Sequence, residues 1–198
     1  SANGSYPHGS LTLYGSKFYG MARTGGINNV GVIFEWDPAT NVYTKKIDLN
    51  NIDSCEPYGS LTLQNGKFYG RTYFGGINNA GVIFEWDPVS NLYSQKTDFS
   101  SDNGYYPYGS LTVYAGKMYG MTSLGGTYNT GVIFEWDPAT NVYSKKIDLI
   151  STTGSNPYGS MTAFGNKFYG MTSRGGINDG GVIFEWDPVN NIYSRKID

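Results

Sequence analysis

The sequence of 198 residues has one cysteine, Cys55, and one histidine, His8. A single cysteine cannot form an intrachain disulfide, so we expect Cys55 to be a free thiol in a loop or at the surface. Clustered His/Cys spacings and acidic calcium loops are also missing from the sequence, so no motif predicts a metal site. With so few nucleophile and base candidates, a Ser-His-Asp or Cys-His catalytic set has no support.

Charge and long hydrophobic runs are scarce as well. Only 15% of residues are charged and the net charge is −2, which argues against nucleic acid and anionic membranes as partners. No apolar run approaches the roughly 18 residues that a membrane span needs. Residues 1–7 lack the basic start and apolar core of a signal peptide. The abundance of Tyr, Asn, Gly, Ser and Thr leads us to expect an extracellular or cell-surface protein.

The sequence contains four copies of a fifty-residue repeat without insertions. GSLTL at Gly9 recurs as GSLTL, GSLTV and GSMTA, and GVIFEWDP at Gly31 recurs unchanged, each at fifty-residue spacing. The repeats run approximately over 1–50, 51–100, 101–150 and 151–198. Self-similarity at this period is typical of propellers and solenoids. We therefore expect either four near-equivalent functional sites or one site on a symmetry axis.

Each repeat predicts four short strands and no helix, because glycines interrupt every window that could hold an amphipathic helix. In the first repeat the expected strands are 10–14, 17–23, 31–37 and 42–49. The DPATN turn between the last two is a hairpin signal. Asp37 can accept backbone N–H groups, Pro38 presets φ, and Asn41 tolerates a left-handed conformation.

The third strand alternates but is apolar on both faces. Val32, Phe34 and Trp36 point one way, whereas Ile33 and Glu35 point the other. Strands covered on both sides are expected in propeller blades. We predict an all-β, four-bladed β-propeller forming a single domain over 1–198, with each blade a four-stranded antiparallel sheet from one repeat. The alternative is an eight-bladed ring formed by two chains, so a monomer is favoured and a dimer is possible.

Two family resemblances follow from these motifs. The Gly-Gly pair and the DP-x-T-N-x-aromatic hairpin resemble the kelch repeat, with Tyr43 where kelch usually has Trp. The whole repeat is more similar to the bacterial GloVer tandem repeat, through Phe68 to Thr72, Gly75-Gly76, Asn78, and Gly81 to Phe84. This resemblance implies a β-propeller from surface or secreted bacterial proteins and implies no activity.

Paired carboxylates recur in every copy, as Glu35 and Asp37 do in the first. General acid/base catalysis needs two carboxyl groups in different environments across a cleft. These pairs lie on one strand near Lys17 and Lys46, so we interpret them as structural cross-strand ion pairs. We expect no enzyme, no catalytic residue and no cofactor. The less favoured alternative is an axial site, where Ser10 and its equivalents would surround an ion or water.

The segments that vary between copies are the loops between the second and third strands and the inter-repeat linkers, which we expect on one face. Aromatic rings beside Asn and Arg suit sugar recognition and, equally, protein contacts. The hypothesis is a non-enzymatic multivalent module that binds glycans at a bacterial surface. Protein–protein interaction or a purely structural scaffold is the alternative. The candidate binding residues are Arg23, Arg71, Tyr73, Phe74, Asn78, Tyr128, Arg174 and Asn178.

Overall fold

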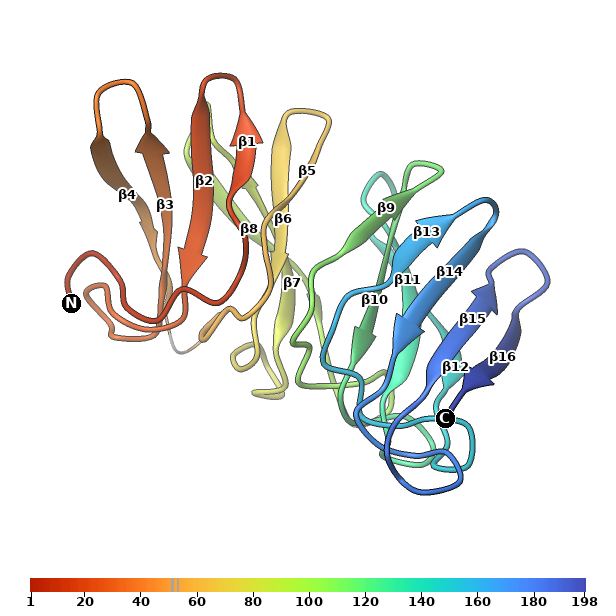
Figure 1. The fold of residues 1–198 in the computed structure, drawn as a ribbon. Coiled ribbons are helices and arrows are strands. Elements are labelled where there is room, and N and C mark those ends of the chain that lie inside the picture. The colour runs from red at the N-terminus through yellow and green to blue at the C-terminus, as the bar shows by residue number, and fades with distance from the viewer. Residues whose placement is uncertain (51, 53) are drawn as a thin grey trace. The chain divides into compact units, whose positions relative to one another are not determined.

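The computed structural model describes residues 1–50, 52 and 54–198, and within them the chain forms sixteen strands and no helix (Figure 1). Accordingly, no described helix could cross a membrane. The strands form four separate four-stranded sheets, each antiparallel and each in sequence order. The all-β prediction with one blade per repeat is confirmed. We number these sheets as blades 1 to 4.

The strands lie close to their predicted positions. Blade 1 contains β1 (Thr12–Tyr14), β2 (Lys17–Ala22), β3 (Val32–Asp37) and β4 (Val42–Asp48). The first strand begins two residues later than predicted. The other blades repeat this layout: β5 (Thr62–Gln64), β6 (Lys67–Arg71), β7 (Val82–Asp87) and β8 (Leu92–Asp98); β9 (Thr112–Tyr114), β10 (Lys117–Thr122), β11 (Val132–Asp137) and β12 (Val142–Asp148); β13 (Thr162–Phe164), β14 (Lys167–Met171), β15 (Ile183–Asp187) and β16 (Ile192–Ile197).

The chain consists of two compact units, Ser1–Phe99 with blades 1 and 2, and Ser100–Asp198 with blades 3 and 4. Each unit has its own apolar core between its two blades. In the first unit the Tyr19 ring of blade 1 lies 4.8 Å from the Phe68 ring and 5.8 Å from the Trp86 ring of blade 2. The second unit repeats this wedge with Tyr119 packed 4.6 Å from Phe168.

The hairpin between the third and fourth strands forms as its sequence predicts. Asp37 Oδ1 accepts the Ala39 N–H at 2.9 Å, and Asn41 has a φ of 57°. The structure adds a contact that the sequence pattern did not predict, because Asn41 Oδ1 also accepts the Trp36 indole N–H at 3.2 Å. Asn41 therefore fixes both the turn and the tryptophan ring that follows from it.

Candidate functional site

The variable segments meet at one end of each blade. The linker that opens each repeat pairs with the loop after its second strand through one isolated bridge, Ser5–Thr24, Cys55–Phe74, Tyr105–Leu124 and Ser155–Arg174. The Glu56 N–H also donates to the Val30 carbonyl of the preceding repeat at 2.8 Å. We call this edge the loop end; in the first unit it lies opposite the tight hairpins (Figure 1).

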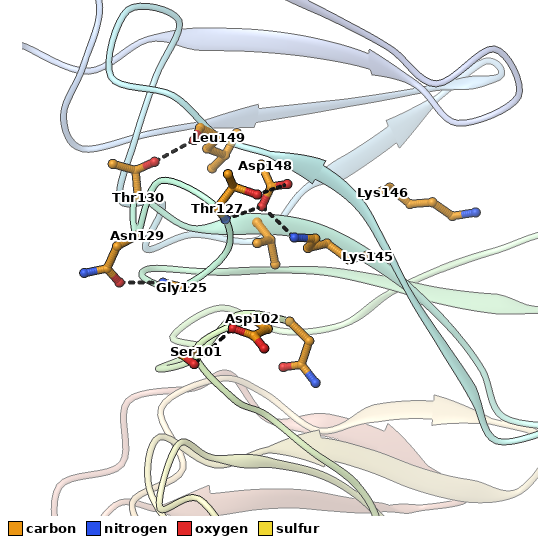
Figure 2. Close-up of polar contacts among 12 residues, drawn as sticks. Ser101, Asp102, Gly125, Thr127, Asn129, Thr130, Lys145, Lys146, Asp148 and Leu149 are labelled. Carbon is orange, nitrogen blue, oxygen red and sulfur yellow. Dashed lines mark hydrogen bonds and ion pairs between the residues drawn. The ribbon is translucent and has the colours of Figure 1, made fainter.

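A carboxylate at the end of each fourth strand fixes the loop. Figure 2 shows the third repeat, where Asp148 accepts the Thr127 N–H at 2.8 Å, the Thr127 hydroxyl at 3.0 Å and the Lys145 ammonium at 2.9 Å. Partial burial alone would raise the pKa of Asp148, but these hydrogen bonds outweigh it and hold the pKa below its ordinary value. In the other repeats Asp48, Asp98 and Asp198 accept the N–H of the equivalent isoleucine.

Polar side chains inside the loop are also engaged. The Asn129 Oδ1 accepts the Gly125 N–H at 3.1 Å, and the Thr130 hydroxyl donates to the Leu149 carbonyl (Figure 2). In the second repeat Asn78 donates its amide to the Phe99 carbonyl at 2.9 Å. Asn78 therefore has a structural role in holding its loop, beside any role in binding.

Three of the predicted binding residues are brought together in the first unit. Arg23 forms an ion pair with Glu56 at 2.9 Å and stacks its guanidinium 4.7 Å from the centroid of the Tyr58 ring. The Tyr73 ring lies 5.3 Å from Tyr58 in a T-shaped contact and 4.5 Å from Phe74. We call these five residues the Arg23 cluster. It joins a cation, an anion and three aromatic rings from two adjacent repeats.

A hollow of about 410 Å³ adjoins the cluster, lined by Val30, Cys55, Glu56, Phe74 and Asn79. The Cys55 side chain is buried, contrary to the expectation of a surface thiol. Burial, reinforced by the neighbouring Glu56 charge, raises the pKa of Cys55 to about 11. The thiol is thus protonated at neutral pH, and the hollow offers shape and polarity rather than a nucleophile.

The other predicted residues lie elsewhere. Arg71 is only 2% exposed, because it takes the place of Met21 in the strand and its side chain enters the interior of the protein. It is not part of the loop surface, which corrects the expectation that it contributes there. Tyr128 is 60% exposed, and Arg174 and Asn178 are exposed as well. The contacts described for the second unit do not bring these three side chains together.

Sequence reasoning missed Glu56 and Tyr58 as members of the site. Glu56 occupies a linker position whose backbone is left-handed in all four repeats, with φ of 54° at Tyr6, 55° at Glu56, 58° at Tyr106 and 53° at Asn156. Residues with side chains seldom adopt this conformation, and the position directly precedes a recurring proline. Backbone bonds to Val30 and Tyr73 hold Glu56 there. The signal available in the sequence was the aromatic residue after that proline, Tyr58, which recurs at fifty-residue spacing.

The paired carboxylates are structural, as predicted. Glu35 accepts hydrogen bonds from the Lys17 ammonium at 2.7 Å and the Tyr19 hydroxyl at 2.9 Å, with Lys46 at 3.8 Å. The same contacts recur around Glu85, Glu135 and Glu185. Among the described residues no three His, Cys, Asp or Glu side chains are grouped to hold a metal ion.

These glutamates predict a dependence of stability on acid. Hydrogen bonds from Lys167 and Tyr169 lower the pKa of Glu185 from 4.5 to about 2. A carboxylate with a lowered pKa stabilises the fold above its unfolded pKa, and that stabilisation is lost as pH falls through the folded pKa. We expect the free energy of unfolding to fall between about pH 4.5 and pH 2, and less steeply in Glu185→Gln. Denaturant titrations at a series of pH values measure it. Asp102→Asn, which removes a carboxylate bonded only to the Ser101 hydroxyl at 3.3 Å, is the control; an equal change in slope there would contradict the assignment.

Comparison with known proteins agrees with this architecture. The family model described as the Gloeobacter/Verrucomicrobia repeat matches residues 1–112 and 53–198, which together cover the chain. The chain belongs to the Gloeobacter/Verrucomicrobia repeat family. This repeat protein has no match among curated proteins.

Solved structures show the same fold at low identity. A crystal structure of TolB from Acinetobacter baumannii superposes with a TM-score of 0.59 at 11% identity, covering 92% of this chain and 41% of that one. A chain of the nidogen/laminin complex gives a TM-score of 0.61 at 13% identity, with 92% and 60% covered. The repeat protein therefore has the blades of a β-propeller and spans less than two thirds of either structure.

Proposed function

We propose that the repeat protein is a non-enzymatic binding module that contacts a partner protein through the Arg23 cluster. The observation that carries this proposal is the arrangement of Arg23, Tyr58 and Tyr73 around one another at the loop end. Tyr and Arg side chains held in a packed, partly covered cluster are the usual anchors of protein–protein contacts. Because the loops are fixed by Asp48 and Asp98, these anchors are presented at little entropic cost.

The state of the polar groups favours a protein over a glycan. Sugar recognition needs an open aromatic face and planar amide or guanidinium groups that can take hydroxyls. Here the Arg23 guanidinium covers a face of Tyr58 and pairs with Glu56, and the Asn78 amide is bonded to the Phe99 carbonyl. The nidogen/laminin structure, one of the similar folds, is a complex between proteins. Glycan binding is the second candidate, and the exposed ring of Tyr128 supports it.

The repeats suggest how such a module would work at a surface. The equivalent loop ends carry different residues, so the four sites would differ in affinity. Weak sites on one chain gain avidity when the ligand presents several copies of its epitope. The composition rich in Tyr, Asn and Gly is consistent with an extracellular or cell-surface location. We therefore place the module at a bacterial surface.

A displayed random-peptide library, panned in parallel with a glycan array, tests the proposal. We expect peptides enriched on the wild-type chain to lose at least tenfold in affinity on Arg23→Ala and on Tyr73→Ala. Arg195→Ala is the matched control, because Arg195 is also a half-exposed arginine paired with a carboxylate, at 3.2 Å from Asp198. Circular dichroism melts of each variant check folding.

The outcomes separate the two candidate functions. Peptide binding that is unchanged in both cluster variants would refute the placement of the site. Array glycans bound by the wild type and lost in Tyr128→Ala would favour the glycan-binding function instead. Absence of any enrichment on either library would overturn the proposal.

A further inference from the structure

The contact between blades inside each unit has two distinct sides. In the first unit a covering face of blade 1 packs on a covered face of blade 2. The covering face consists of Tyr14, Tyr19, Met21, Ile33 and Ile47, and the covered face of Leu61, Phe68, Phe84, Trp86 and Tyr93. In the second unit Tyr114, Tyr119, Met121, Ile133 and Ile147 of blade 3 cover Met161, Phe168, Phe184, Trp186 and Tyr193 of blade 4.

The two contacts are nearly identical in geometry. The Tyr19 and Tyr119 rings lie 5.8 Å from Trp86 and Trp186, respectively. The Thr12 and Thr112 hydroxyls donate to the Leu61 and Met161 carbonyls, both at 2.6 Å. A covering face and a covered face of this sequence therefore form a defined, repeatable joint.

One covered face and one covering face remain exposed. On blade 1 the covered-face positions hold Leu11, Phe18, Phe34, Trp36 and Tyr43, the same residue types as on blade 2. Leu11 is 47% exposed, whereas its equivalent Leu61 is 3% exposed. A hollow of about 450 Å³ lies over this face, lined by Leu11, Gly20, Phe34, Trp36 and Tyr43, among others.

The exposed covering face lies on blade 4. It holds Phe164, Tyr169, Met171, Ile183 and Ile197, the residue types of blade 3 except for Phe in place of Tyr114. Met171 is 63% exposed, whereas Met121 is 2% exposed; Ile183 is 40% exposed and Ile133 fully buried. Apolar groups of this size are buried wherever the equivalent joint is formed, so the two exposed faces are complementary surfaces without a partner.

We propose that the covered face of blade 1 binds the covering face of blade 4 from a second copy of this chain. The occupant is specified by the internal joint, since each side offers the residue types that already pack together twice. The contact is heterologous, and two copies can make it twice. The polar bonds of the joint identify its expected partners. Thr162 would donate to the Leu11 carbonyl of the second copy, and the Ser160 N–H to its Ser10 hydroxyl, as Ser110 does to Ser160 at 2.7 Å.

Sedimentation equilibrium with single-residue variants tests this inference. The wild type is expected at twice the 21.7 kDa chain mass, and both Leu11→Asp and Met171→Asp are expected at one chain mass. Both changes lie on exposed side chains, so the folded blades should persist, which circular dichroism verifies. Val89→Asp, at an equally exposed valine in a hairpin turn outside both faces, should stay dimeric.

Mixing the two monomeric variants provides the sharper test. A pair made of one Leu11→Asp chain and one Met171→Asp chain retains one unaltered joint, so the mixture should regain a species of twice the chain mass. A wild type that stays at one chain mass at all concentrations would overturn the proposal. A dimer that survives either variant, or a mixture that stays monomeric, would do so too. None of these outcomes depends on the ligand of the Arg23 cluster, so the two proposals fail independently.

Discussion

Replacing Phe68 by alanine is expected to destabilise the protein by about 3–5 kcal/mol, the usual cost of removing a fully buried phenylalanine. Phe68 is inaccessible to solvent and lies in the middle of the joint between blades 1 and 2. Its ring contacts Tyr19 at 4.8 Å, Trp86 at 5.4 Å and Tyr14 at 5.9 Å. Three rigid rings cannot collapse into the space left behind, so the cavity term is added to the lost hydrophobic burial. Equilibrium unfolding in guanidinium chloride measures the loss.

The repeat provides a matched control for this substitution. Phe18 has the same position in blade 1, where it stacks on Trp36 at 5.7 Å but is only half-buried. We expect Phe18→Ala to cost about 1–2 kcal/mol, within the range of ordinary substitutions. The comparison is made in the Met171→Asp background, so that a second copy cannot cover Phe18. Equal losses at the two positions would show that the joint does not carry the stability assigned to it.

The strands and hairpins could be predicted because every repeat states them with the same local signals. Asp37 and Asn41 define a turn whatever surrounds them, and the apolar residues on both sides of 31–37 require a sheet covered on both faces. The bulge between Ile33 and Phe34 was not predictable in the same way. No glycine or proline marks it, and it depends on how β3 and β4 pair.

The candidate site was only partly predictable for a physical reason. Position in a loop does not tell which way a side chain points, so Arg71 could be assigned to the surface although strand alternation carries it into the interior. Glu56 was missed because its left-handed backbone is fixed by bonds to two different repeats. Contacts between neighbouring copies, such as Arg23 over Tyr58, need the packing of blades and cannot be read from one repeat.

The second large effect is expected from Gly126→Ala, at the second glycine of the Gly-Gly pair that precedes the loop of the third repeat. Gly126 has a φ of 76°, which costs a residue with a side chain about 1–2 kcal/mol. A Cβ there would also overlap the Asp148 carboxylate and lie 2.7 Å from Val132 Cγ1. Such overpacking costs a further 1–3 kcal/mol or so, and we expect a total loss of about 2–5 kcal/mol in denaturant unfolding.

The cause of that loss can be isolated with two further variants. Gly180→Ala is the control, because no atom lies within 4 Å of a Cβ there and its φ is not positive. Asp148→Ala removes the carboxylate and with it the bonds to Thr127 and Lys145, which should cost about 1–3 kcal/mol. If the overlap is the cause, the double variant loses less than the sum of the two single variants. Strict additivity would instead assign the whole loss at Gly126 to its backbone conformation. Hydrogen exchange at the Thr127 amide distinguishes the two explanations, since only displacement of the carboxylate releases that N–H.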